Sequence, residues 1–251
     1  MNDFITGLQF LTRIKIAEQQ VWSAESFGRS VKYFSFVGAS LGALLWLLAM
    51  ALTFLPERLG FLPAPQSVSS LVLLMAAVFL TGGLTCDGFM DSMDGLFSGR
   101  ERERMLEIMK DSRVGANGVT AFVFLVLAKW SALQGMLPVQ VGAAIWAMPI
   151  IGRMAMVIAI TCFPYARPDG IGKAFAEHAG TGTLLLAMLS GGFFLALGGW
   201  KICVAGLAAI CMALLFAHWA SKQLEGLTGD LYGACCEISE VCLLMMVLLL
   251  G

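Results

Sequence analysis

Three aspartates at helical spacing are the residues of this sequence best suited to do chemistry. Asp87, Asp91 and Asp94 lie in "TCDGFMDSMDGLFSGR" (85–100), where one of the most apolar runs of the chain ends. At about 100° per residue, positions i, i+4 and i+7 share one face of a helix, where three carboxylates repel one another unless a cation joins them. Carboxylate oxygens suit Mg²⁺ or Mn²⁺. The pattern therefore predicts a Mg²⁺ site at these three residues; the alternative is a solvated helix end.

A basic segment follows the aspartates directly. The residues "RERERMLEIMKDSR" (100–113) carry charges on one side and Met, Leu and Ile on the other, which predicts an amphipathic helix on the membrane surface over about 100–113. Lys110, Asp111 and Arg113 crowd the return into the next apolar run. Cations beside a metal-binding face are what a phosphate or diphosphate needs. We therefore predict a phosphate-binding role there; the alternative is a positively charged membrane anchor.

Two glutamates near the C-terminus are the next candidates. Glu237 and Glu240, at i and i+3, share a helix face early in the last apolar run. Acidic residues within a membrane span indicate a function by default. The alternative is that they pair with Lys129 or Arg153, two cations near the middle of other runs. We expect Glu237 to lie shallower than these cations, which argues against pairing.

The composition shows what kind of fold must position these residues. The chain has 251 residues, 59% hydrophobic and 13% charged, with a mean hydropathy of +0.83, whereas a soluble domain carries about 25% charged residues. We predict an all-α, polytopic membrane bundle forming a single domain over 1–251, with no removable signal peptide. About seven apolar runs are long enough to span a bilayer as helices: 34–55, 67–86, 118–137, 141–163, 181–200, 202–220 and 232–250.

Lysines and arginines predict the orientation of the bundle. With the N-terminus in the cytoplasm, the inside segments hold twelve of them, whereas only Arg58 and Lys201 lie outside. The twelve are Arg13, Lys15, Arg29, Lys32, Arg100, Arg102, Arg104, Lys110, Arg113, Arg167, Lys173 and Lys222. The positive-inside rule favours this choice. It places the aspartates and the loops at 164–180 and 221–231 on the cytoplasmic side.

Five segments form an ordered set of motifs along the chain. They are "FLTRIKI" (10–16), "YFSFVG" (33–38), "DGFMDSMDGLFSGRERERMLEIMKDSRVGANG" (87–118), "YARPDGIGKAF" (165–175) and "GLTGDLYGACCEISE" (226–240). Together they resemble the cobalamin synthase family, the adenosylcobinamide-GDP ribazoletransferases, almost from end to end. The chain departs from the family pattern in three places. Thr85 stands where His is usual, Lys15 where Pro is common, and Cys235 and Cys236 where a small residue and often Asn precede Glu237.

The resemblance implies the last assembly step of the cobalamin nucleotide loop, at a bacterial inner membrane. The ribose hydroxyl of α-ribazole or its 5′-phosphate attacks a GDP-activated corrinoid, GMP leaves, and Mg²⁺ is required. Asp87, Asp91 and Asp94 would hold Mg²⁺, whereas Lys110, Asp111, Arg113, Arg167, Lys173 and Asp230 would form the phosphate-binding surroundings. The resemblance and the spacing favour Glu237 or Glu240 as the acceptor of the hydroxyl proton, with Asp91 as the rival. The expected partners are these small molecules and the lipid bilayer, without nucleic acid; a homo-oligomer is left open.

Other protein classes also place carboxylates in membranes. A CDP-alcohol phosphotransferase has an Ala-Arg pair after its first motif, which this chain lacks behind Asp94 and Gly95. An intramembrane prenyltransferase has a second Asp-rich motif on another helix. A cation or solute transporter holds its carboxylates near the bilayer midplane on broken helices, whereas those of this chain are expected at the cytoplasmic boundary. These alternatives therefore fit less well than the ribazoletransferase.

Overall fold

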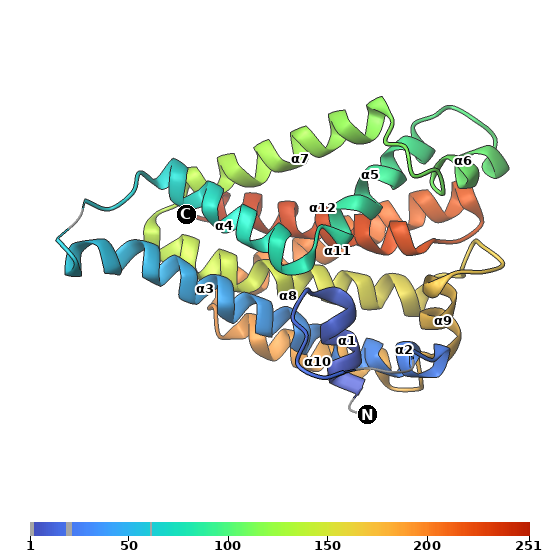
Figure 1. The fold of residues 1–251 in the computed structure, drawn as a ribbon, viewed down its shortest axis with the longest axis horizontal. Helices are drawn as coiled ribbons and strands as arrows, with labels where there is room; N and C mark the ends of the chain where they lie inside the picture. The colour runs from blue at the N-terminus through green and yellow to red at the C-terminus, as the bar shows by residue number, and fades with distance from the viewer. Residues whose placement is uncertain (1–2, 19–21, 61) are drawn as a thin grey trace.

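The structure, a computed structural model, describes residues 3–18, 22–60 and 62–251. The helices in these ranges are α1 (Asp3–Leu11), α2 (Ala24–Ser30), the short 3-10 helix η1 (Val31–Tyr33), α3 (Phe34–Arg58), α4 (Gln66–Thr81), α5 (Leu84–Leu96), α6 (Arg102–Ile108), α7 (Ala116–Gly135), α8 (Pro138–Cys162), α9 (Ile171–His178), α10 (Thr183–Ala196), α11 (Trp200–Leu224) and α12 (Gly229–Leu249). Figure 1 shows the longer helices lying along the long axis of the molecule. The predicted all-α bundle is confirmed.

Helix α8 forms the centre of the bundle. Its 25 residues have no polar face and most of them are buried, because a helix that is apolar on all sides needs neighbours all round. Gly38 and Gly42 of α3 face it. A Cβ on Gly38 would lie 2.6 Å from the Pro149 carbonyl oxygen, and one on Gly42 would lie 2.3 Å from that of Trp146. This glycine spacing lets the backbones of α3 and α8 touch.

Five helices are long and apolar enough to cross a membrane, and seven spans result if each of two bent helix pairs counts as one. The chain is therefore a membrane protein with several spanning helices, as predicted. The five are the segment from α2 to Pro56, which includes α3, and helices α7, α8, α11 and α12. The bent pairs are α4 with α5 and α9 with α10.

The prediction of one continuous span at 67–86 is wrong. Helix α4 ends at Thr81, and Gly82 and Gly83 adopt left-handed φ angles of 68° and 74°. Helix α5 then starts with its axis turned by 90°. Paired glycines permit this turn, because a side chain would be strained at these φ angles. The three aspartates consequently lie on a helix of their own, which runs toward one end of the bundle (Figure 1).

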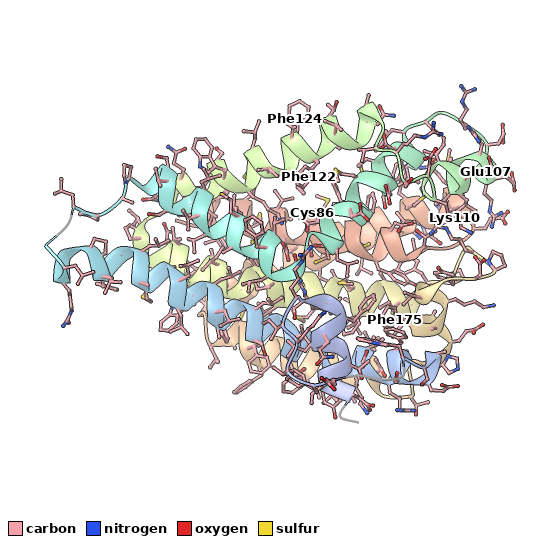
Figure 2. The ribbon with its side chains drawn as sticks, in the orientation of Figure 1. Cys86, Glu107, Lys110, Phe122, Phe124 and Phe175 are labelled. Carbon is pink, nitrogen blue, oxygen red and sulfur yellow. The ribbon has the colours of Figure 1, made fainter. Side chains whose placement is uncertain are left out.

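The amphipathic helix predicted over 100–113 is shorter and more deeply docked than expected. Only Arg102–Ile108 is helical, as α6. Arg102 Nε donates to the Leu224 carbonyl oxygen at 2.9 Å, and Arg102 Nη2 donates to that of Ala166 at 3.3 Å. A cation is favourable at the C-terminus of a helix such as α11. Helix α6 therefore packs on the end of the bundle, where Figure 2 labels Glu107 and Lys110.

The loop at 164–180 is fastened to the same end. Tyr165 and Leu227 form an isolated parallel β-bridge. The Phe175 ring packs edge-on against those of Phe10, Phe27 and Phe34, with centroids 5.1, 5.6 and 5.6 Å away. The segments expected on the cytoplasmic side thus share one end of the molecule, while the side of the membrane that this end faces stays a prediction.

Candidate active site

Helices α5 and α12 approach so closely that their backbones are in contact. A Cβ on Gly88 would lie 2.8 Å from the Asp230 carbonyl oxygen, and one on Gly233 would lie 3.1 Å from that of Thr85. Thr228 caps the start of α12 by accepting a hydrogen bond from the Leu231 N–H. These glycines place Asp230 beside the aspartates of α5, a neighbour that helix periodicity alone did not predict.

Asp94 anchors the start of α7. Its Oδ2 accepts from the Gly115 N–H at 2.7 Å and its Oδ1 from the Gly118 N–H at 2.8 Å. A Cβ on either glycine would lie within 2.5 Å of a carboxylate oxygen, which explains the glycines of "VGANG". A carboxylate at a helix N-terminus satisfies free N–H groups and the helix dipole. Both oxygens of Asp94 are therefore engaged, and its predicted metal-binding role stays a prediction.

Asp87 and Asp91 differ from Asp94 in having no partner. Over 3–18, 22–60 and 62–251, no hydrogen bond or ion pair involves either carboxylate. Asp87 is exposed and Asp91 is partly buried. Asp91 lies within electrostatic reach of Asp87, Asp94, Asp230 and Arg167. Neither carboxylate therefore has an ion-pair partner among the described residues, and a bound cation would supply one.

The carboxylate oxygens of Asp87 and Asp91 are possible ligands for a magnesium ion. No three His, Cys, Asp or Glu side chains of the described residues are gathered closely enough to hold a metal ion. Magnesium is usually bound by one or two carboxylates, completed by water and substrate phosphate oxygens. Asp87 and Asp91 fit that requirement, whereas Asp94, with both oxygens hydrogen-bonded, does not add a ready third ligand.

The predicted phosphate-binding cations separate into two groups. Arg167 Nη2 lies 2.8 Å from Asp230 Oδ2, and the Arg167 side chain is only 11% exposed. Its Nε has no hydrogen-bond acceptor among the described residues. Arg167 is thus brought to the aspartates with donor capacity left over.

The other predicted cations find partners elsewhere. Lys110 pairs with Asp169 at 3.2 Å, and Lys173 donates to the Pro168 carbonyl oxygen at 2.8 Å. Arg113 pairs with Asp111 at 2.8 Å, and its hydrogen bonds lower the pKa of the Asp111 carboxyl to about 2. These contacts are exposed, so substrate can displace them at little cost.

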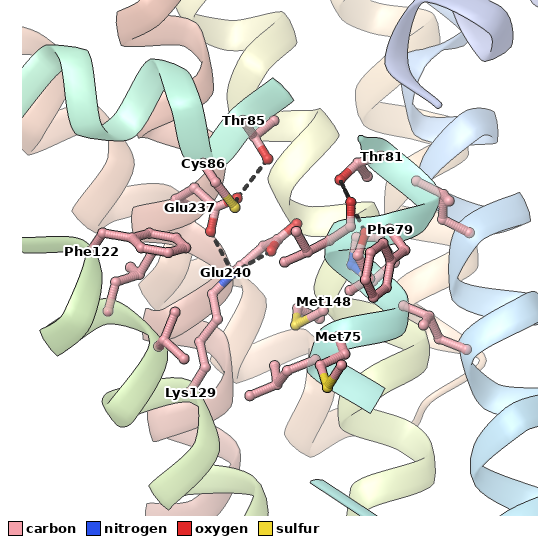
Figure 3. Close-up of a pocket in the computed structure, with 18 of the residues that line it drawn as sticks. Met75, Phe79, Thr81, Thr85, Cys86, Phe122, Lys129, Met148, Glu237 and Glu240 are labelled. Atoms are coloured by element: carbon pink, nitrogen blue, oxygen red, sulfur yellow. Dashed lines mark hydrogen bonds and ion pairs between the residues drawn. The ribbon is translucent and has the colours of Figure 1, made fainter. Parts of the chain in front are cut away.

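The two glutamates of α12 lie in a buried ion network. Lys129 Nζ is 2.7 Å from Glu237 Oε2 and 2.6 Å from Glu240 Oε2. Arg153 Nη1 is 2.9 Å from Glu240 Oε1, and the Thr85 hydroxyl donates to Glu237 Oε1 at 2.5 Å. Figure 3 shows Thr85, Lys129 and the two glutamates converging from α5, α7 and α12. We call these five side chains the buried ion network.

The expectation that Glu237 lies too shallow to pair is wrong. Helix α12 begins at Gly229, three residues before the predicted start of the span, so Glu237 lies about 4.5 Å further from the start of its helix than expected. The flexible stem of Lys129 also lets its ammonium group reach sideways. Each glutamate is already held by a cation, so it is a poor acceptor for a substrate proton. The assignment of a proton acceptor to Glu237 or Glu240 stays untested, and the network makes Asp91 the better candidate.

A groove opens beside Asp87. Its volume is about 660 Å³, and Arg13, Gly82 and Asp87 are among the residues that line it. The Arg13 N–H donates to the Leu80 carbonyl oxygen at 2.7 Å, and the side chain lies against Gly82 at the break between α4 and α5. From its residue type and spacing alone, Arg13 has no predicted role at the site. Its place in the "FLTRIKI" motif is the one sequence feature that points to a role.

Comparisons with known proteins place the chain in a family. Residues 3–248 match the family model described as cobalamin-5-phosphate synthase. Adenosylcobinamide-GDP ribazoletransferase of Desulfitobacterium hafniense (strain Y51) is 42% identical over 98% of this chain and 96% of its own length. The enzyme of the same name from Alkaliphilus metalliredigens (strain QYMF) is 39% identical over 100% and 96%. That of Pseudomonas putida (strain GB-1) is 37% identical over 98% of both chains.

No solved structure matches the chain. The likeness to these relatives covers all five motifs, including the α5 aspartates and the α12 glutamates. The chain therefore belongs to the cobalamin-5-phosphate synthase family, the membrane transferases of cobalamin biosynthesis.

Proposed function

We propose that this enzyme joins GDP-activated adenosylcobinamide to α-ribazole or its 5′-phosphate and releases GMP. The names of the relatives support these substrates. One observation in the structure carries the assignment of the site: neither Asp87 nor Asp91 has a partner among the described residues. Asp87 lines the groove, and Asp91 lies within electrostatic reach of Arg167. Unpaired carboxylates next to an arginine with free donors suit a diphosphate bound together with a metal ion.

The proposed metal is Mg²⁺, held by Asp87 and Asp91. When bound, it would offset the negative charge of the diphosphate and of the departing GMP. We leave Asp94 out of this site, because the N-terminus of α7 occupies both of its oxygens. Arg167 and Arg13 would bind phosphate oxygens, since a guanidinium group donates two parallel hydrogen bonds to phosphate.

The proposed transfer is a single displacement at phosphorus. The acceptor hydroxyl attacks the phosphorus that carries the corrinoid, the bond from this phosphorus to the GMP oxygen breaks, and the hydroxyl proton passes to Asp91. Asp91 is partly buried and unpaired, as a proton acceptor must be, and a positioned carboxylate accelerates such a step about 10²–10⁴-fold. A carboxylate has two oxygens, so Asp91 can face the metal with one and the hydroxyl with the other.

The proposed location is a bacterial inner membrane, with the groove open to the cytoplasm. The lysine and arginine bias supports this orientation, as does the clustering of α6, the 164–180 loop and the start of α12 at one end. Both substrates carry phosphate or sugar groups that do not cross a bilayer. They therefore have to reach the groove from the side of the membrane on which they are made, which we propose is the cytoplasm.

The test uses the purified protein with adenosylcobinamide-GDP, α-ribazole phosphate and magnesium. We expect GMP and the joined corrinoid to form in equal amounts, and we expect neither with EDTA. Asp87→Asn should be inactive, whereas Glu225→Gln, which changes an exposed carboxylate at the end of α11, should keep full activity. Release of GMP without the acceptor, or equal rates with and without magnesium, would refute the proposal.

A further inference from the structure

A second hollow lies deeper in the bundle than the groove. It has a volume of about 280 Å³ and is bounded by α3, α4, α5, α7, α8 and α12. Most of its wall is apolar, and Met75, Phe79, Phe122 and Met148 surround it (Figure 3). All five residues of the buried ion network line it as well. We call this hollow the inner cavity.

The inner cavity adjoins the groove. Val78, Thr81, Cys86 and Phe122 line both. In Figure 2, Phe122 lies on the side of α7 that faces Cys86, while Phe124, 67% exposed, lies on the outer side. A molecule with its charged part in the groove can therefore place an apolar part in the inner cavity.

The polar wall of the inner cavity contains buried donors that have no acceptor in the described part of the chain. Arg153 is 1% exposed, and its Nε and Nη2 have no acceptor among the described residues. Lys129 Nζ carries three N–H groups and bonds two carboxylates. Buried donors without acceptors are costly, and buried charges within a membrane indicate a function by default. The missing acceptor is a group that a ligand brings.

We infer that the inner cavity binds the aromatic base of the acceptor nucleoside, while its ribose and phosphate stay at the aspartates. This inference rests on the proposed function. Ligand pockets typically measure about 300–1,000 Å³, and the inner cavity, at about 280 Å³, is at the small end. It can hold one bicyclic ring, whereas a corrin macrocycle is too large for it. Phenylalanine rings and methionine sulfurs make favourable contacts with a flat aromatic ring.

The polarity of the cavity separates the two bases that take part in the reaction. Guanine carries donors and acceptors around most of its edge, and a wall that is polar on one side would leave several unpaired. The benzimidazole base of α-ribazole is apolar except for one ring nitrogen with a lone pair. This nitrogen can accept a hydrogen bond from one of the unpaired donors in the wall. The cavity therefore favours the benzimidazole base of α-ribazole over the guanine of GDP.

The test fills the cavity from a wall that takes no part in the proposed chemistry. Ala77 of α4 lines the inner cavity, and its neighbour Ala76 does not, although both are partly buried. Ala77→Phe should raise KM for α-ribazole by about tenfold or more, and leave KM for adenosylcobinamide-GDP within about twofold. Ala76→Phe should change neither. Val126→Phe, on the α7 wall of the inner cavity and not in the lining of the groove, gives a second route if Ala77→Phe does not fold.

A change of substrate separates a blocked pocket from a general defect. The riboside of imidazole has a single ring and needs less room, so Ala77→Phe should shift the kcat/KM ratio of the two ribosides toward imidazole by about tenfold. An unchanged ratio in a folded, active variant would overturn the inference. The inference would also be overturned if Ala77→Phe lost a co-purified lipid while both KM values stayed unchanged. That result would show that a lipid chain occupies the cavity. If wild-type protein releases no GMP at all, the proposed function fails instead.

Discussion

Replacing Lys129 by methionine should destabilise the protein strongly, because one ammonium group holds two buried carboxylates. Lys129, Glu237 and Glu240 are 6%, 3% and 5% exposed, and the ammonium nitrogen is 2.7 and 2.6 Å from the two glutamates. Methionine keeps the apolar stem and removes the charge. Breaking a buried ion pair leaves an uncompensated charge and costs about 3–5 kcal/mol. In a chain of this size that lowers Tm by about 6–20 °C.

Thermal unfolding of the detergent-solubilised protein, followed by tryptophan fluorescence, measures this loss. Lys222→Met is the matched control, because Lys222 is exposed near the end of α11 and should lose no more than about 2 °C. Adding Glu237→Gln to Lys129→Met removes one of the unpaired charges and should recover part of the loss. A Tm for Lys129→Met equal to that of Lys222→Met would refute the buried ion network.

Two further predictions come from the helix contacts, and a third comes from the lysine and arginine bias. Asp94→Asn should lose about 1–3 kcal/mol of stability, since an amide cannot accept from both N–H groups at the start of α7, whereas Asp87→Asn should keep the wild-type Tm and lose GMP release. Gly88→Ala should lower both Tm and rate, because its Cβ would meet the α12 backbone at 2.8 Å; Gly192→Ala, with open space around it, should change neither, and similar Tm values for the two would contradict the close packing. A cysteine at Ser98, in a background without reactive native thiols, should be labelled in intact cells only by reagents that cross the membrane, and labelling by an impermeant reagent would reverse the orientation.

The arrangement of the α5 aspartates could be predicted only in part. Helical spacing correctly placed Asp87, Asp91 and Asp94 on one helix. It could not show that Asp94 faces the start of α7, because Gly115 and Gly118 are 21 and 24 residues away in the sequence. The contact depends on how α5 packs against α7, and local periodicity carries no information about that packing.

The depth of the glutamates shows a second limit. Hydropathy predicts the ends of an apolar run only to within a few residues. An uncertainty of that size is enough to decide whether Glu237 is expected level with Lys129 or apart from it. Lys129 and Arg153 were the partners named in the alternative interpretation of the glutamates, and the structure pairs both of them with Glu240. The break at Gly82 and Gly83 was also missed, since adjacent glycines occur in straight membrane helices as well.

The broken helix and the buried charges together explain how a membrane chain can host polar substrates. The turn after α4 lets α5 place Asp87 at the groove, and Arg13 packs on the turn itself. Irregular backbone is tolerated at membrane depth where it lines a cavity. The same device is typical of transporters, but this chain matches transferases over nearly its whole length, so we propose that the break positions the aspartates for catalysis.

The rate of GMP release by Asp91→Asn tests the central claim most directly. Asp91 is partly buried, has no partner among the described residues, and lies within electrostatic reach of Asp87 and Asp230. The variant is to be measured in single turnover with saturating adenosylcobinamide-GDP, α-ribazole phosphate and magnesium, after its Tm has been shown to equal that of the wild type. We predict a fall of about 10²–10⁴-fold. A folded Asp91→Asn protein that releases GMP at nearly the wild-type rate would contradict the assignment of catalysis to the aspartate face of α5.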